Sequence, residues 1–469
     1  MTKQADPAVG AAHRRPFDER YQAGKQLRAA TPRANLAEFS AGDRDPVAIF
    51  NETNKGRLPA LLPIRRQRMA QSPFAFLRGA AALMAVDLAG QPTPGIKTQS
   101  CGDCHLMNFG AFLSPEGNAL FDINDFDETL PDVDFTVDLK RLAASFAVAA
   151  LAAGDNDKSA RRIAKNVALA YRERMATLAR LSPLGAWNAR INLTQEAVGL
   201  FDDGLAKKLR LAAAQKNADR EEDANFPHIT RDAATGDRRI NDNLPLIYHV
   251  PDTEDPSIHV DIPAVFAEVT NTLAPEVATL LARYKLADSA FKVVGVGSVG
   301  TYCAIGLFIT QDGDPLFLQI KEALTSALER LHAAPWPGQQ GARVVAGQRI
   351  MQAATDLFLG WTTDPASGRQ FYVRHLKNRR LGSISELLET KALPQYATLC
   401  GRTLARAHAR SADAATLWGY MGKDEVFADA IASFAMLYAA QNKKDFAAFV
   451  AAGDPGEPAK AVGGKNARA

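Results

Sequence analysis

The stretch "AFKVVGVGSVGTYCAIGLFITQDGDPLFLQIKEA" (residues 290–323) decides the fold. It contains three apolar runs, which the glycines of "GVGSVG" and the turn formers of "QDGDP" separate, and this pattern predicts an antiparallel meander. A dinucleotide-binding G-x-G-x-x-G needs a helix directly after it, whereas the β-branched, apolar "TYCAIGLFI" follows here. We therefore expect Gly295, Gly297 and Gly300 to lie in the turn of a hairpin.

A glycine-rich hairpin has a specific chemical use. Its main-chain amides can approach phosphate groups closely, as the phosphate loop of kinases does. Lys321 ends the third apolar run, where its ammonium group needs an anion, and an α- or β-phosphate is a natural partner. A lysine that snorkels from a strand edge is the alternative, and the upstream hairpin favours the phosphate. The expected nucleotide-binding residues are Gly295, Gly297, Ser298, Gly300 and Lys321.

A second stretch, "SCGDCHLMNFG" (100–110), allows two interpretations. Cys101, Cys104 and His105 match the C-x-x-C-H attachment site of a c-type haem, while Asp103, His105 and Asn108 match a phosphoryl-transfer loop. The N-terminus lacks the apolar segment of an export signal, so we expect a cytoplasmic protein and no haem. The two cysteines are then expected to be small packing residues, with a redox or zinc role as the alternative.

Acidic residues follow closely in "NALFDINDFDE" (118–128), which contains Asp122, Asp125 and Asp127 behind a short apolar run. A phosphotransferase needs a carboxylate that orients the acceptor and hard oxygen ligands for Mg²⁺. Together with "GDCHLMN", these residues supply both kinds of group.

Composition limits the other possibilities. The chain has 469 residues, of which 47% are hydrophobic, enough for two or three lobes around a buried core. Its 55 basic and 52 acidic residues leave a formal charge of +3, so the net charge predicts neither a nucleic-acid nor a membrane partner. The longest apolar stretch, residues 142–154, is too short to span a membrane and predicts a buried helix. Nothing in the sequence indicates an oligomeric state.

The pattern along the chain is helix-rich α+β. Residues 1–40 are polar and predict a loose arm or short surface helices. A helix is expected from Ser72-Pro73 to Gly90, long helices from 135 to 215, and a connector or exposed ribbon over 213–243.

Several motifs together resemble the bacterial family known as domain of unknown function 2252, over most of residues 45–415. They are "GDCHLMNFG", "FDINDFDE", "DLKRLAASF", "GVGSVGT", "LQIKEA" and "LARAHARSAD". The G-D-x-H-x-x-N signature is also similar to the catalytic loop of aminoglycoside phosphotransferase-like kinases.

The kinase resemblance implies a role for each matching residue. Asp103 would be the base or acceptor-orienting residue and His105 would orient its loop. Asn108 and Asp122 would bind Mg²⁺, with Asp125 as the alternate ligand. Asp138 resembles the aspartate that braces the catalytic loop; an ordinary aspartate at a helix N-terminus is the alternative.

This sequence departs from the kinase pattern in three ways. Cys101 stands where those kinases have a histidine, and the helix expected at 341–356 has no glutamate to pair with Lys321, although Glu322 and Glu329 are near in sequence. The catalytic loop also precedes the glycine hairpin, the reverse of the usual order. A circular permutation reconciles the order, because residues 400–413 resemble the helix that normally feeds the catalytic loop.

The implied fold is a helix-rich, protein-kinase-like two-lobe α+β fold, circularly permuted, with an antiparallel β nucleotide-binding lobe. Its expected parts are an arm (1–44), a catalytic-loop and metal-binding lobe (45–215), a connector (216–284), a nucleotide-binding lobe (285–378), returning helices (379–450) and a disordered tail (451–469).

The implied function is ATP- and Mg²⁺-dependent phosphoryl or nucleotidyl transfer to an unknown small-molecule or protein acceptor. Two alternatives stay open: nucleotide binding without catalysis, and a metal-dependent phosphoesterase, because G-D-x-H also opens two-metal phosphatase sites. The arginines that are candidates to hold an anionic substrate, or else are surface charges, are Arg65, Arg66, Arg68 and Arg374.

Overall fold

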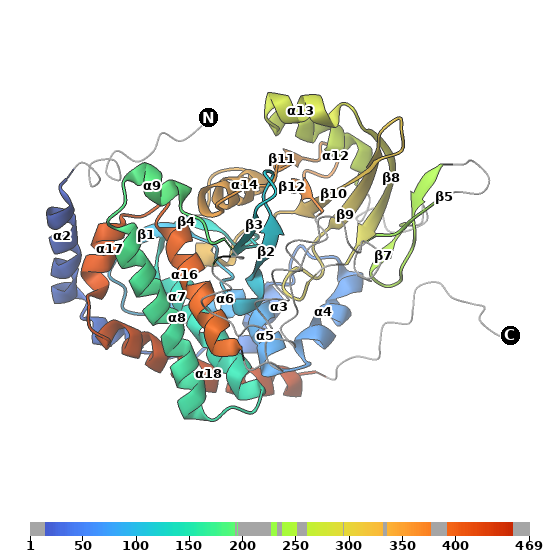
Figure 1. The fold of residues 1–469 in the computed structure, drawn as a ribbon. Helices are drawn as coiled ribbons and strands as arrows, with labels where there is room; N and C mark the ends of the chain where they lie inside the picture. Colours follow the sequence, from blue (N-terminus) through green and yellow to red (C-terminus); the bar gives the residue numbers. More distant parts are fainter. Residues whose placement is uncertain are drawn as a thin grey trace.

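The computed structural model describes residues 15–192, 195, 227–231, 237–250, 260–293, 295–331, 335–376 and 392–453. Within these ranges a body of helices lies beside a six-stranded antiparallel sheet (Figure 1). The α+β class predicted from the sequence is therefore confirmed. The predicted disordered tail lies almost wholly outside the described residues.

The six-stranded sheet contains the predicted meander. Strands β8 (Lys285–Lys292), β9 (Cys303–Ile309) and β10 (Pro315–Glu322) pair antiparallel in chain order, which confirms the prediction. The full order is β11-β12-β10-β9-β8-β7, where the added strands are β7 (Ile247–Tyr248), β11 (Gly360–Thr363) and β12 (Gln370–His375).

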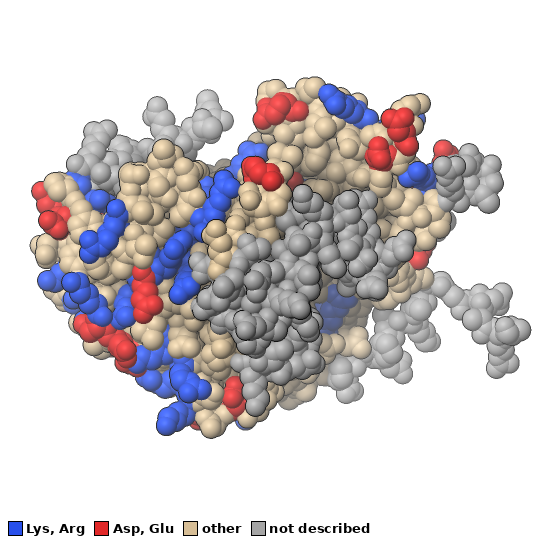
Figure 2. Space-filling model, viewed as in Figure 1, with Lys and Arg blue, Asp and Glu red and all other residues tan. Residues whose placement is uncertain are grey.

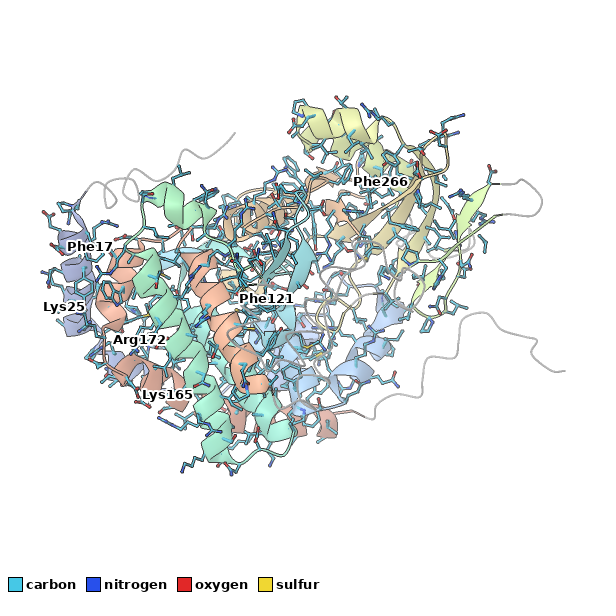
Figure 3. All side chains as sticks on the ribbon, in the orientation of Figure 1. Phe17, Lys25, Phe121, Lys165, Arg172 and Phe266 are labelled. Atoms are coloured by element: carbon cyan, nitrogen blue, oxygen red, sulfur yellow. The ribbon has the colours of Figure 1, made fainter. Side chains whose placement is uncertain are left out.

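Two helices cover the sheet. Phe266 of α12 (Ile262–Val269) packs against Gly306 of β9, where a Cβ atom would lie only 2.5 Å from the ring (Figure 3). Between β10 and β11 the chain forms α14 (Gln340–Met351), which contacts both β11 and β12. Because α14 also contacts the strands of the helical body, it lies between the two parts of the protein.

The helical body is built around α7 (Thr136–Ala152), the helix predicted from the apolar stretch at 142–154. Every residue of α7 from Thr136 to Ala150 is buried. The helices that pack around α7 and one another are α8 (Asp157–Leu178), α16 (Leu393–His408) and α18 (Val426–Ala451). Within the described ranges, no helix combines the length and apolar character that crossing a membrane requires.

The described part of the predicted N-terminal arm is a packed helix. Helix α2 (Phe17–Ala30) lies against α17 (Ala414–Met421), and Tyr21 contacts Trp418 with ring centroids 4.9 Å apart. Glycines on both helices, at positions 24 and 419, allow their main chains to approach closely. The sequence predicted a loose arm or short surface helices, and residues 17–30 form a helix.

The helix predicted from Ser72 to Gly90 is two helices, α5 (Pro73–Gly79) and α6 (Ala81–Leu88). Its start is as predicted, because the Ser72 hydroxyl accepts a hydrogen bond from the main chain of Ala75 at 3.0 Å. The break falls beside Gly79, which faces the Met69 side chain so closely that a Cβ atom would overlap the thioether.

Small sheets flank the predicted catalytic loop. Strand β1 (Lys97–Ser100) pairs with β4 (Leu130–Asp134), and β2 (Phe109–Leu113) pairs with β3 (Ala119–Ile123). A further pair, β5 (Ile229–Arg231) with β6 (Arg238–Ile240), forms a ribbon inside the segment predicted to be a connector or exposed ribbon. The remaining helices are α3 (Pro46–Glu52), α4 (Leu62–Met69), α9 (Pro183–Asn188) and α13 (Pro275–Leu281).

Lys140 on α7 gives a prediction about stability. It is 1% exposed, its ammonium group has no hydrogen-bond partner among the described residues, and it lies 4.5 Å from the centre of the Phe434 ring. Burial lowers its pKa from 10.5 to about 8. Below pH 8 the folded state therefore holds an unfavourable charge, and this cost disappears as the pH rises towards the pKa of the unfolded chain.

We expect Lys140→Met to raise the free energy of unfolding by about 2–3 kcal/mol at pH 7, with a smaller gain at pH 10. Urea denaturation at the two pH values measures this. Lys158→Met on the exposed face of α8 is the matched control and should change little. A gain from Lys140→Met that is equal at both pH values would show that the lysine charge is not its cause.

Candidate functional site

The loop between β1 and β2 is held in place by Asp138, at the first turn of α7. Its carboxylate accepts hydrogen bonds from the Ser100 hydroxyl at 2.6 Å and from the main chain of Cys101 and Gly102 at 2.8 and 3.0 Å. His408 Nε2 lies 3.1 Å from the same carboxylate. Burial raises the pKa of Asp138, but the hydrogen bonds from His408 and the loop outweigh this and lower it overall. Asp138 therefore braces the loop from the first turn of α7.

His408 was not singled out from the sequence, and it stands 270 residues from Asp138. It ends α16, and its other ring nitrogen lies 2.9 Å from the Tyr171 hydroxyl. Just beyond it, the Ser411 hydroxyl accepts a hydrogen bond from the main chain of Gln99 at 2.9 Å. The end of α16 therefore lies beside β1. His408 of α16 contacts Asp138, which holds the loop in which Cys101 stands at the position of the kinase histidine.

Asp103 lies in this loop and forms an ion pair with Arg141 of α7. Arg141 Nε donates to Asp103 Oδ1 at 2.7 Å, and the arginine side chain is 2% exposed. Burial raises the pKa of Asp103, and the Arg141 charge opposes that rise. Asn108 Nδ2 donates to the main-chain oxygen of Asp103 at 2.6 Å. Two of the predicted residues, Asp103 and Asn108, are thus in direct contact.

His105 has a structural position in the loop. Its Nδ1 accepts a hydrogen bond from the main chain of Met107 at 3.2 Å, and its Nε2 lies 3.6 Å from Asp103 Oδ2. Burial, with the nearby charges of Arg78 and Arg141, lowers the pKa of His105 well below its usual value. The imidazole is therefore neutral at physiological pH, and its contacts suit the loop-orienting role predicted for it.

The acidic segment after β3 joins the same site. The main chain of Asn124 donates to the main-chain oxygen of Asn108 at 2.8 Å, which brings the chain next to Asp125 alongside the loop. Asp125 Oδ1 accepts a hydrogen bond from the main chain of Asp127 at 3.1 Å. Burial and the neighbouring Asp127 carboxylate raise the pKa of Asp125.

Asp127 connects this segment to the six-stranded sheet. Its Oδ2 accepts hydrogen bonds from Lys321 Nζ at 2.6 Å and Ser298 Oγ at 3.0 Å, and its Oδ1 accepts one from the Tyr372 hydroxyl at 2.6 Å. Burial raises the pKa of Asp127, but the Lys321 charge and these hydrogen bonds bring it down to about 2. The pair with Lys321 is therefore ionised at any physiological pH.

Asp127 also supplies the partner of Lys321 that could not be assigned from the sequence. Glu322 pairs instead with Arg369 at 2.9 Å. Helix α14 carries no carboxylate, and Arg343 on it donates to the main-chain oxygen of Asp127 at 3.0 Å. In the sequence, the "DFD" repeat was the only signal for Asp127, because it offers a second carboxylate two positions after Asp125.

The glycine turn between β8 and β9 closes the site. Gly295 and Gly300 have φ angles of +68° and +93°, which favour glycine. A Cβ atom at Gly297 would lie 3.8 Å from Asp103 Oδ2, so the turn passes directly beside that carboxylate. Gly297, Ser298 and Lys321 therefore lie beside Asp103 or Asp127, and Gly295 and Gly300 belong to the same turn.

The turn is also tied to the segment that precedes the predicted catalytic loop. Arg68 donates to the main-chain oxygen of Gly295 at 2.6 Å, and Arg57 donates to that of Val299 at 2.7 Å. Arg68 was considered as a substrate ligand or a surface charge. In the structure its hydrogen bond to Gly295 holds the glycine turn in place.

The structure does not place Asp122 with these residues. Its carboxylate is fully buried in an ion pair with Arg406 of α16, and it accepts main-chain hydrogen bonds from Ile123 and Ala353 at 2.9 and 2.8 Å. With these donors in place, neither oxygen is open to a metal ion. The kinase resemblance implied Asp122 as a Mg²⁺ ligand with Asp125 as the alternate; of these two, Asp125 is the one that lies beside Asp127 and the loop.

Three other candidate arginines differ in their surroundings. Arg65 and Arg66 lie over aromatic rings of the helical body, 4.7 and 4.6 Å from the ring centres, so packing explains both. Arg374 on β12 lies in the site, where it donates to Gln319 at 3.0 Å and its charge acts on Asp125 and Asp127.

Cys101, Cys104 and Asp138 form the one group of three or more potential metal-ligating side chains in the described part of the chain, with ligand atoms within 4.8 Å of one another. The Asp138 oxygens already accept the hydrogen bonds given above. Burial raises the pKa of both thiols, that of Cys104 to about 11, so neither is a thiolate at neutral pH. This environment suits packing residues better than a zinc or redox centre.

The site combines a braced acidic loop with a glycine turn and a buried lysine, and the sequence carrying it matches one known family. The chain belongs to the family described as "Uncharacterized protein conserved in bacteria (DUF2252)", which matches residues 57–452. This confirms the family expected from the motifs. The curated proteins and the solved structures give no match to the chain.

Proposed function

We propose that this protein is an ATP- and Mg²⁺-dependent phosphotransferase with a circularly permuted kinase-like fold. The observation that carries the proposal is the 2.6 Å contact between Lys321 and Asp127, which stand 194 residues apart. It joins the lysine strand of the sheet to the acidic segment beside Asp103 and Asn108. A single nucleoside triphosphate can therefore contact both the sheet and the acidic segment.

The arrangement of the sheet supports the kinase-like assignment. In protein kinases a glycine-rich loop covers the phosphates, a lysine on the third strand contacts them, and a helix with an ion-pairing glutamate stands nearby. Here the glycine turn joins β8 and β9, Lys321 lies on β10, and α14 follows. Asp127 takes the ion-pairing role of the missing glutamate.

The position of α16 supports the permutation. Its end lies beside β1 through the Ser411–Gln99 hydrogen bond, and β1 leads directly into the catalytic loop. A short link between these two points would restore the usual order of helix, catalytic loop and acidic strand. Permutation is tolerated where the two ends that are joined lie close in space and the chain is opened at an exposed connection.

The donor set fits a magnesium–nucleotide complex. Asn108 and Asp125 offer the hard oxygen ligands that Mg²⁺ prefers, whereas both oxygens of Asp127 already accept hydrogen bonds. Of the Asp125 and Asp127 carboxylates, that of Asp125 is better placed to bind the metal, because only one of its oxygens accepts a hydrogen bond among the described contacts. When bound, Mg²⁺ would neutralise charge on the transferred phosphoryl group.

The remaining side chains have distinct roles in this proposal. Asp103 accepts a hydrogen bond from the acceptor hydroxyl and orients it, while Arg141 fixes the carboxylate. Lys321 contacts the phosphates, and the amides of the glycine turn lie over them. Ser298, which now donates to Asp127, would release this contact as phosphates enter beneath the turn.

A thermal-shift comparison tests the nucleotide site. Mg-ATP at 100 times its dissociation constant should stabilise the protein by about 2.7 kcal/mol. Lys321→Ala should abolish this stabilisation, measured against the same variant without ligand. Lys285→Ala, which changes an exposed lysine of the same sheet, is the matched control and should respond like the parent. No response of the parent, or an equal response of Lys321→Ala, would rule out the proposed site.

A further inference from the structure

The ribbon formed by β5 and β6 lies against the edge of the six-stranded sheet, beside β8 (Figure 1). Ile240 of β6 is 3% exposed and belongs to an apolar cluster with Ile305 and Leu307 of β9. Lys321 stands opposite Cys303, two positions before Ile305, so its side chain lies on the same face of the sheet as this cluster. The ribbon therefore covers part of the face that carries Lys321.

A histidine and two aspartates fasten the ribbon to the sheet. His249 follows β7, and its Nδ1 lies 2.7 Å from Asp242 Oδ1 in the segment after β6. The other ring nitrogen, Nε2, lies 3.1 Å from Asp288 Oδ2 on β8. The same Asp288 oxygen accepts a hydrogen bond from the main chain of Ile240 at 2.7 Å. His249 thus connects the end of β6 to a strand of the six-stranded sheet.

This arrangement requires a charged histidine. An ionised carboxylate only accepts hydrogen bonds, so both ring nitrogens must carry a proton if both are to donate. A neutral ring has one N–H and would turn a lone pair towards one of the two carboxylates. The hydrogen bonds with Asp288 and Asp242 raise the pKa of His249, while burial opposes the rise. Burial raises the pKa of Asp288, but the hydrogen bond with His249 outweighs this and lowers it overall.

The charges that act on His249 are those of Asp288 and Asp242. Arg238 of β6 donates to the main-chain oxygen of Gly313 at 2.5 Å. Acidic side chains also lie over the end of the sheet near β8 (Figure 2). The other charged residues on the strands around the histidine are Arg231 of β5, Arg239 of β6, and Lys285 and Lys292 at the two ends of β8. His249 therefore titrates between two carboxylates.

We propose that His249 is a pH-sensitive latch, which holds the β5–β6 ribbon on the face of the sheet beside Lys321 and releases it when the ring loses its proton. The folded chain binds this proton more tightly than the unfolded chain does. The latch therefore acts fully below the pKa of a free histidine, about 6.5, and its contribution is lost as the pH rises through the higher pKa of the folded protein. The inference does not depend on the proposed phosphotransferase activity.

Hydrogen exchange of the full chain, followed by mass spectrometry at pH 6 and pH 9 and corrected for the intrinsic exchange rate, tests the latch. Protection of the amides in residues 238–248 should fall about tenfold or more at pH 9, while that of β9 and β10 stays unchanged. His249→Gln should give low protection of the ribbon at both pH values. His228→Gln is the control, because His228 binds the ribbon through its main-chain oxygen, and it should behave like the parent.

A second variant keeps the test sharp if His249→Gln does not fold. Asp242 is exposed, so Asp242→Asn is expected to fold, and it removes one of the two negative charges beside the ring. The loss of protection should then occur at a lower pH than in the parent. Equal protection of the parent ribbon at both pH values, or an unchanged pH dependence in either variant, would overturn the latch. An equal loss of protection in β9 and β10 would show a general loss of stability and contradict a local device.

Discussion

Asp103→Asn should lower the rate of phosphotransfer from Mg-ATP by about 10²–10⁴-fold. The amide keeps the size of the side chain but loses the charge that orients the acceptor hydroxyl. Mg-ATP should still stabilise the variant, because the phosphates and metal are held by other residues. The measurement is the turnover of ATP together with the ligand-induced thermal shift.

This variant also removes one partner of the buried ion pair with Arg141, so it should lose stability as well. Asp87→Asn is the matched control, because Asp87 is buried and paired with Arg44 at 2.7 Å, outside the site. It should lose stability and keep its turnover. Equal turnover of Asp103→Asn and Asp87→Asn would exclude Asp103 from the mechanism. Stabilisation of the parent by Mg-ATP without any turnover would indicate a nucleotide-binding protein without catalysis.

Asp122→Ala should lower the free energy of unfolding by about 3–5 kcal/mol, because it leaves Arg406 charged and buried without its carboxylate. The double variant Asp122→Leu with Arg406→Met should recover much of this loss, since apolar side chains can replace a buried ion pair. Chemical denaturation of the parent, the single variant and the double variant measures both effects.

The same double variant distinguishes a structural Asp122 from a metal ligand. If Asp122 only pairs with Arg406, Mg-ATP should stabilise the double variant as much as the parent. A folded double variant that no longer responds to Mg-ATP would restore Asp122 as a metal ligand and remove Asp125 from that role.

The sequence was informative where one local pattern determined the structure. Alternating apolar runs with glycines predicted the meander of β8 to β10, and the apolar stretch at 142–154 predicted the buried α7. The motifs also singled out Asp103, Asn108 and Lys321; in the fold Asn108 contacts Asp103, and Lys321 pairs with Asp127 of the nearby acidic segment. Each of these predictions rests on neighbouring residues.

The contacts that the sequence could not predict involve partners distant in the chain. Three aspartates in "FDINDFD" look alike in sequence, but Asp122 lies within β3 and faces α16, whereas Asp125 and Asp127 follow the strand and face the sheet. His408 and Arg141 carry no local signal for their contacts with the loop, because only tertiary packing brings α16 and α7 beside it.

The central claim is that two stretches far apart in the chain form one nucleotide–metal site. A crystal structure with Mn²⁺ and a non-hydrolysable ATP analogue tests this most directly, through the anomalous signal of the metal. The account predicts a manganese peak beside Asn108 and Asp125, with the analogue phosphates between Lys321 and the glycine turn. A peak at Asp122 or at the cysteine pair, or an analogue bound away from Lys321, would contradict it.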